Sequence, residues 1–117
     1  MEYEITVRIW EKNVAEMYYD VRRVYDTEKH FPPPVYEDDK RVEMWKMDIE
    51  DRNTQIAYYR DVVVDPEGKK WIIEWDSNLG RTILLGLEGE IKGSPDEIEF
   101  RDYEIIGNIY ESPQILT

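Results

Sequence analysis

Apolar and polar residues alternate along much of the chain, most regularly over residues 2–9. One side of this segment carries Tyr3, Ile5, Val7 and Ile9, and the other carries Glu2, Glu4, Thr6 and Arg8. A period of two is typical of a β-strand with one face in the core and one in solvent, because successive strand side chains point to opposite faces. We therefore predict a half-buried strand over residues 2–9 that extends to Trp10.

Residues 14–25 fit two different patterns. A helical stripe would consist of Val14, Met17, Tyr18, Val21 and Val24, with Asn13 and Glu16 in capping positions. Met17, Tyr19 and Val21 also alternate as in a strand, and tyrosine and valine favour strands. The local pattern therefore leaves helix and strand open for this segment.

Strand patterns return after the proline-rich stretch. Residues 42–44 and 45–49 alternate in opposite phases, as at a β-bulge or a strong bend. Residues 55–64 become apolar on both faces toward their end, which predicts a central strand. Residues 65–68 have Asp, Pro and Gly at type I turn positions, and residues 70–76 alternate again. This strand, turn and strand together predict a hairpin.

The last third of the chain contains shorter strand signals. Residues 77–80 predict a turn and residues 82–87 a short strand, after which Gly86, Gly89, Gly93 and Pro95 interrupt regular structure. A final strand is predicted from Tyr103 to Ile109, with Gly107 where a side chain would crowd a neighbour.

Short strands separated by Gly, Pro and Asn turns predict an all-β fold. We expect a small meander or partly open barrel with at most one or two short helices. Residues 28–40 include three consecutive prolines and predict a stiff surface loop. The length of 117 residues fits a single domain over residues 1–117.

Composition narrows the possible functions. The chain has 15 Lys and Arg against 27 Asp and Glu, a net charge of −12, which argues against direct binding of nucleic acid or an anionic membrane. With no cysteine and one histidine, thiolate zinc sites, disulfides and paired imidazoles are excluded. Residues 1–15 lack the apolar segment of a secretory signal, and no apolar run approaches the ~20 residues of a membrane span. We therefore expect a cytoplasmic protein.

The negative charge is concentrated in the second half of the chain. Residues 61–117 contain 5 basic and 13 acidic residues, a net charge of −8. In a strand, Glu97 and Glu99 would project from the face opposite Ile98 and Phe100, and such a carboxylate row suits a basic protein partner. The candidate partner-binding carboxylates are Glu88, Glu90, Asp96, Glu97 and Glu99.

Tyrosines provide a second kind of candidate contact. Each of the pairs Tyr18–Tyr19 and Tyr58–Tyr59 would place one ring in the core and one in solvent if it lies on a strand. We take Tyr19 and Tyr59 as the outward rings, because an exposed tyrosine is an effective anchor in protein interfaces. Base stacking would use the same rings, but the basic groove that follows a nucleic-acid backbone is missing.

A hydrolytic triad is not expected. His30, the one imidazole, falls in the predicted proline loop. The three serines, Ser77, Ser94 and Ser112, fall in predicted turns, where serine is common for backbone reasons. We therefore predict no catalytic residue.

Metal and phosphate motifs are also weak. Carboxylate clusters occur at residues 37–39, 48–51 and 96–99, and one of them could supply ligands to a magnesium ion. Gly86, Gly89 and Gly93 lack the Gly-Lys-Ser/Thr ending of a phosphate-binding loop, so a wide turn between strands is the expectation there. We predict no cofactor and no metal site.

Three segments carry a family resemblance. They are VRIWEK at residues 7–12 with MYYD at residues 17–20, then residues 51–63, and IIGNIYESPQIL at residues 105–116. Together they resemble the YopX family of small phage and prophage proteins, whose C-terminal segment reads V-I-G-N-I-Y-E-N-P-E-L-L. Thr54 and Arg60 stand where that family usually has glycine. The resemblance implies a mainly β, SH3-like architecture, a strand over residues 17–21 and a phage or prophage origin, and it supplies no catalytic residues.

These observations favour a non-enzymatic phage accessory protein that binds a host or phage protein through its acidic β surface and exposed tyrosines. In its sharper form, this hypothesis describes an inhibitor that occupies the basic groove of a nucleic-acid enzyme. One alternative is a self-assembling structural protein whose sheet edges and apolar tail at Ile115–Leu116 pack against further copies. A second alternative is a metal-dependent hydrolase that uses one of the carboxylate clusters.

Overall fold

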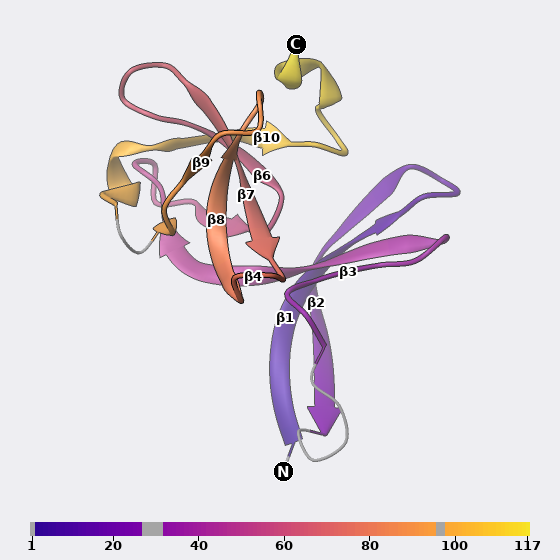
Figure 1. Ribbon diagram of the computed structural model, residues 1–117. Helices are drawn as coiled ribbons and strands as arrows, with labels where there is room; N and C mark the ends of the chain where they lie inside the picture. Colours follow the sequence, from indigo (N-terminus) through magenta and orange to yellow (C-terminus); the bar gives the residue numbers. More distant parts are fainter. Residues whose placement is uncertain (1, 27–31, 96–97) are drawn as a thin grey trace. The chain divides into compact units, whose positions relative to one another are not determined.

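The computed structural model describes residues 2–26, 32–95 and 98–117 (Figure 1). These residues form two antiparallel sheets and two short 3-10 helices, and neither sheet closes into a barrel. The prediction of an all-β fold is confirmed. The chain divides into two compact units, Met1–Lys46 (unit 1) and Met47–Thr117 (unit 2). The boundary between the units falls inside one strand. The single domain over residues 1–117 stays a prediction.

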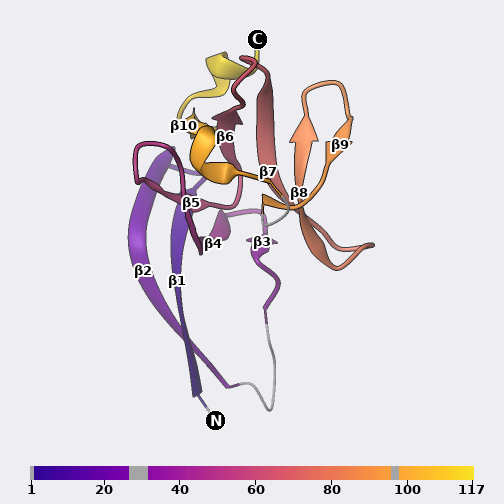
Figure 2. The ribbon, with the colours of Figure 1, turned by 90° about the vertical axis from the view of Figure 1, so that its left-hand side faces the viewer.

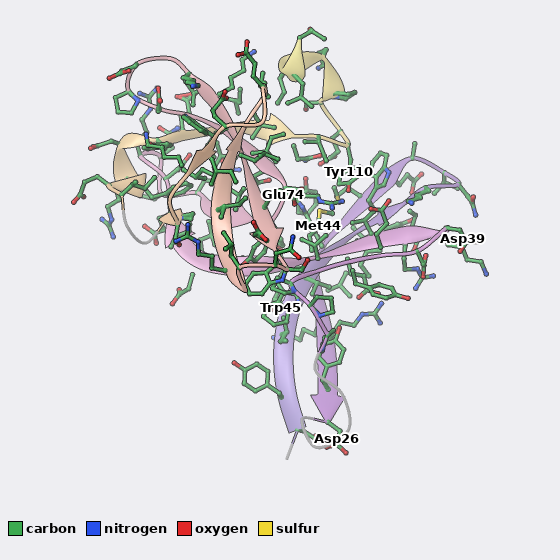
Figure 3. All side chains as sticks on the ribbon, viewed as in Figure 1. Asp26, Asp39, Met44, Trp45, Glu74 and Tyr110 are labelled. Atoms are coloured by element: carbon green, nitrogen blue, oxygen red, sulfur yellow. The ribbon has the colours of Figure 1, made fainter. Side chains whose placement is uncertain are left out.

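Unit 1 contains four strands in the order β2-β1-β4-β3. They are β1 (Glu2–Glu11), β2 (Glu16–Asp26), β3 (Val35–Glu37) and β4 (Arg41–Glu50), of which β4 continues into unit 2. β1 and β2 form a long curved hairpin (Figure 1), and Asp39 lies at the tip of the shorter β3–β4 hairpin (Figure 3). Of the predicted loop over residues 28–40, residues 28–31 lie outside the described residues, and the described part includes the short strand β3.

β2 shows that residues 16–26 are a strand and not a helix. The segment pairs with β1 along its length, from Glu2 opposite Asp26 to Glu11 opposite Glu16. A register shift lies between the pairs Val7–Val21 and Ile9–Tyr18, where β2 contains one residue more than β1. This is a β-bulge, and the φ of 55° at Asp20 belongs to it. The local pattern was compatible with a helix or a strand, and pairing with β1 makes this segment a strand.

The core of unit 1 follows the predicted alternation on β1. Ile5, Val7 and Ile9 are buried and pack against partly buried Val21, Tyr25 and Trp45. The predicted alternation fails at two residues: Tyr3, on the predicted core face, is 49% exposed, and Arg8, on the predicted polar face, is only 2% exposed. Its partner in the β1–β4 register is Met44, which is fully buried as well. β1 is therefore covered on both faces at this position, which a period of two cannot reveal.

Unit 2 forms the sheet β10-β6-β7-β8-β9, while β5 pairs with β4. The strands are β5 (Ile56–Tyr58), β6 (Asp61–Val64), β7 (Lys70–Asp76), β8 (Arg81–Gly86), β9 (Ile91–Lys92) and β10 (Glu104–Asn108). The two 3-10 helices are η2 (Phe100–Asp102) and η3 (Pro113–Leu116). The consecutive strands β6 to β9 form the predicted meander (Figure 2). Within the described ranges, no helix is long and apolar enough to cross a membrane.

The single strand predicted over residues 55–64 is wrong, because a turn at Tyr59 and Arg60 separates β5 from β6. Arg60 has a φ of 69°, and its backbone N–H donates to the carbonyl of Ile73 at 2.7 Å. Its Nε donates to Glu74 Oε1 at 3.0 Å, and its Nη1 donates to the hydroxyl of Tyr110 (Figure 3 labels both partners). These contacts come from residues far away in the sequence and stabilise a strained turn, which the local sequence pattern could not predict.

The charge of Arg60 is secured by the same contacts. Burial acts to lower the pKa of its guanidinium, but the carboxylate of Glu74 and the hydroxyl of Tyr110 outweigh burial and raise the pKa above its ordinary value. Arg60 is therefore a fixed cation that joins the β5–β6 turn to β7 and to the segment after β10.

The hairpin predicted at residues 65–68 is confirmed. The Gly68 N–H donates to the carbonyl of Asp65 at 2.9 Å, and Val63 pairs with Trp71 across β6 and β7. Asp65 Oδ1 accepts the N–H groups of Glu67 and Lys69, and Oδ2 accepts Trp71 Nε1–H at 3.1 Å. Burial acts to raise the pKa of Asp65, but these hydrogen bonds outweigh it, so the pKa lies below its ordinary value of 3.8.

This shift predicts a pH dependence of stability. Because the pKa of Asp65 is lower in the folded chain than in the unfolded chain, its contribution is complete at neutral pH and is lost as the pH falls below about 4. We expect the free energy of unfolding, measured with urea, to fall over this range in the wild type. Asp65→Asn should show a smaller acid-dependent loss, and an identical loss in the two proteins would contradict the assignment.

The C-terminal part of unit 2 departs from prediction in one place. A strand that would project Glu97 and Glu99 from one face was considered for this region, but residues 98–100 form a turn that leads into η2, and Glu97 lies outside the described residues. β10 confirms the last predicted strand at Glu104–Asn108, with a register shift between Ile105 and Gly107. A Cβ on Gly107 would lie 3.0 Å from Ile115 Cδ1 and from Ser112 Oγ, so the predicted crowding is confirmed.

Candidate functional site: an acidic hollow in unit 2

Two of the carboxylate clusters singled out in the sequence meet at one hollow in unit 2. The hollow has a volume of about 430 Å³ and is lined by Asp48, Ile49, Glu50, Ile56, Pro95, Ile98, Glu99, Phe100 and Arg101. Residues 48–50 come from β4, and residues 98–101 come from the turn and η2. Asp96 and Glu97 lie outside the described residues. Chain segments distant in sequence thus build a common surface.

The two contributing segments share a short sequence pattern. Residues 48–50 read Asp-Ile-Glu and residues 97–99 read Glu-Ile-Glu, so each places an isoleucine between two carboxylates. Sequence reasoning selected the carboxylates and missed the isoleucines, although the repeated acid-Ile-acid triplet was visible. Ile56, which begins β5, adds a further apolar side chain that is 38% exposed.

Asp51 fixes the end of β4 from which Asp48 and Glu50 project. Its carboxylate is 2% exposed, and its Oδ1 accepts the backbone N–H groups of Asn53 and Gln55, both at 2.9 Å. Its Oδ2 accepts the N–H of Ile105 in β10 at 2.8 Å. Asp51 therefore does not line the hollow with the other carboxylates of its predicted cluster. It is a structural hydrogen-bond acceptor, and all of these contacts lie inside unit 2.

The chemistry of the hollow suits a basic, partly apolar segment. Asp48 and Glu99 are exposed, Glu50 is half-buried, and Arg101 is the one cation among the described residues of the lining. Lysine and arginine bury their methylene stems on apolar surface while the charged ends stay near water or a carboxylate. Ile49 and Ile98 offer such a surface. Over the described residues, no group of three His, Cys, Asp or Glu side chains could hold a metal ion.

The other predicted carboxylates lie elsewhere in unit 2. Glu88 and Glu90 line a separate hollow of about 370 Å³, together with Gly68, Lys69, Lys70 and Leu87. Lys69 Nζ lies 3.7 Å from Glu90 Oε1, so two cations offset the two carboxylates there. The structure therefore does not bring Glu88 and Glu90 together with Glu99.

The predicted division of the tyrosine pairs is wrong at both pairs. Tyr18 and Tyr19 are each 47% exposed, because the bulge on edge strand β2 interrupts the alternation. Tyr58 and Tyr59 are both buried, because the chain turns directly after Tyr58. The hydroxyl of Tyr59 forms a 2.6 Å hydrogen bond with Thr82 Oγ1. Tyr19 thus remains a surface candidate, whereas Tyr59 does not.

The remaining motifs have structural settings. His30 lies outside the described residues. Gly86 and Gly89 belong to the β8–β9 hairpin, in which the Gly86 N–H donates to the carbonyl of Glu90 at 2.8 Å. The apolar tail considered for contacts with further copies packs in its own unit, where Lys70 Nζ donates to the carbonyl of Ile115 at 2.6 Å.

Neither a family model nor a curated protein matches this chain.

Proposed function

We propose that the chain is a non-enzymatic phage or prophage accessory protein that binds a basic segment of a host or phage protein in the acidic hollow of unit 2. One observation carries this proposal: the triplet Asp48-Ile49-Glu50 and the pair Ile98-Glu99, which are distant in sequence, line the same hollow. An apolar surface bordered by carboxylates matches a segment in which lysine or arginine alternates with apolar residues.

The charge distribution supports the same proposal. Unit 2 contains 16 acidic and 7 basic residues, a net charge of −9, within the −12 of the whole chain. A surface of one sign raises the rate at which an oppositely charged partner is encountered, and added salt reduces that effect. A basic partner would therefore associate with unit 2 rapidly at low ionic strength.

The proposed phage origin rests on the resemblance to the YopX family. Two backbone angles support the resemblance. Thr54 has a φ of 62° and Arg60 a φ of 69°. These are the two positions at which that family usually has glycine, the residue that adopts positive φ most readily. In this chain, Thr54 and Arg60 therefore adopt the positive φ that glycine would adopt at these two positions.

The experiment uses a defined probe, the acetylated and amidated peptide Lys-Leu-Lys-Leu-Lys, titrated into the full chain by isothermal calorimetry. We expect Glu99→Lys to weaken binding by about tenfold, because an attractive contact becomes a repulsive one. The matched control is Glu67→Lys, which makes the same charge change at an exposed residue of the β6–β7 turn. This control should change binding by less than about twofold after the general charge effect is screened by salt.

Equal weakening by Glu99→Lys and Glu67→Lys would contradict the proposal, because it would show a response to net charge alone. Equal binding of the peptide in which glutamate replaces lysine would contradict it as well. Circular dichroism of both variants verifies that neither substitution unfolds the chain.

A further inference from the structure

A second pocket, in unit 1, has a different composition from the acidic hollow. Its volume is about 270 Å³, and it is lined by Tyr25, Pro32, Pro33, Tyr36, Glu43 and Trp45. Three aromatic rings and one carboxylate therefore face a space large enough for a single side chain. None of these residues was predicted from the sequence to be a functional candidate.

The sheet of unit 1 brings these residues together from three strands. Tyr36 on β3 is directly opposite Glu43 on β4, so their side chains lie on one face. Trp45 (labelled in Figure 3) is two residues further along β4 and shares that face. Tyr25 comes from β2 and packs with Trp45 against the core of β1. The pocket is thus built on strands and not on a loop alone.

Glu43 supplies the carboxylate of the pocket lining and is paired on one side with Arg23. Its side chain is 16% exposed, and its Oε1 accepts Arg23 Nε–H at 2.9 Å. A carboxylate has about four lone-pair sites on its two oxygens, so Glu43 can accept another donor in addition to Arg23. The pKa of Tyr25 is raised, first by burial and then by the charge of Glu43, with Arg23 acting in the opposite direction.

We infer that this pocket receives the alkylammonium group of a lysine side chain from a protein partner. Aromatic rings attract a cation through the negative faces of their π-systems, and several rings around one cation form the usual aromatic cage. Glu43 adds an acceptor for the ammonium hydrogens. A proline-rich segment is the other occupant that aromatic rings favour, but it carries no charge to match the carboxylate. This inference rests on unit 1 alone and is independent of the acidic hollow.

The test compares N-acetyl-lysine amide with N-acetyl-norleucine amide, which has a similar carbon chain without the amine. Each is titrated into the full chain, and the indole N–H resonance of Trp45 is followed by nuclear magnetic resonance. We expect the lysine compound to shift this resonance in a saturable manner and the norleucine compound to bind at least about fivefold more weakly, because a cation over aromatic rings gains energy that a neutral chain does not.

Two variants locate the effect. Tyr36 is 44% exposed, so Tyr36→Ala should fold and should weaken lysine binding by about fivefold. The matched control, Tyr18→Ala, removes another exposed ring of unit 1 that does not line the pocket, and it should leave binding unchanged. Equal binding of norleucine, equal effects of the two variants, no shift of Trp45, or a shift with a triproline peptide in place of lysine would overturn the inference.

Discussion

Asp51→Ala is expected to lower the free energy of unfolding by about 3 kcal/mol, because three backbone N–H groups lose their acceptor at once. Asn53 and Gln55 are exposed, so water can replace the carboxylate at their N–H groups, whereas the N–H of Ile105 is partly buried in β10. Most of the cost should therefore come from the lost connection between the end of β4 and β10. Urea denaturation followed by tryptophan fluorescence measures the change.

Asp51→Asn is the matched control for this prediction. Its amide keeps one oxygen for the N–H groups of Asn53 and Gln55, but it must present an NH₂ group where Oδ2 accepts the N–H of Ile105. We expect a loss between those of the wild type and the alanine variant. A change of less than about 0.5 kcal/mol in Asp51→Ala would contradict the role given to this carboxylate.

Gly107→Ala is expected to lower the free energy of unfolding by about 2–4 kcal/mol, because two costs are added. The φ of 153° at Gly107 is one that residues with a side chain rarely adopt. A Cβ there would also lie 3.0 Å from Ile115 Cδ1, so η3 would have to shift away from β10. The same urea denaturation gives the value.

Gly68→Ala separates these two costs. Gly68 has a φ of 87° in the β6–β7 turn, but a Cβ added there would meet no atom within 4 Å. This variant should therefore show the conformational cost alone, about 1 kcal/mol. Equal losses at Gly68 and Gly107 would show that the contact with Ile115 contributes nothing.

Local patterns predicted those parts of the fold in which neighbouring residues determine the conformation. The alternation over residues 2–9 identified β1 and three of its buried residues, Ile5, Val7 and Ile9, and the Asp-Pro-x-Gly segment at residues 65–68 identified the β6–β7 turn. Gly107 was also correctly expected to lack space for a side chain. In each of these segments, side-chain periodicity or turn chemistry is itself the physical cause of the structure.

The errors fall where contacts between distant residues decide the conformation. Arg8 sits on the polar face of an alternating strand, yet it is buried opposite Met44. The turn at Arg60 depends on Glu74 and Tyr110, which follow it by 14 and 50 residues. Residues 16–26 become a strand through pairing with β1. No window of a few residues contains this information.

The candidate site could be predicted in part. The carboxylates of residues 48–50 and Glu99 were visible as clusters, but their meeting at one hollow required the path of the chain between them. The pocket around Tyr25, Tyr36 and Trp45 could not be predicted, because its rings come from three strands whose register was unknown.

The most direct test of the proposed function locates the basic peptide on the folded chain. Titration of Lys-Leu-Lys-Leu-Lys into isotopically labelled protein, followed by the backbone amide resonances, should shift Ile49, Ile56 and Ile98, and salt should reduce the shifts. The same amides should respond weakly in Glu99→Lys. Shifts confined to Lys70 and Leu87, which line the other hollow of unit 2, or no saturable shift at all, would contradict binding in the acidic hollow.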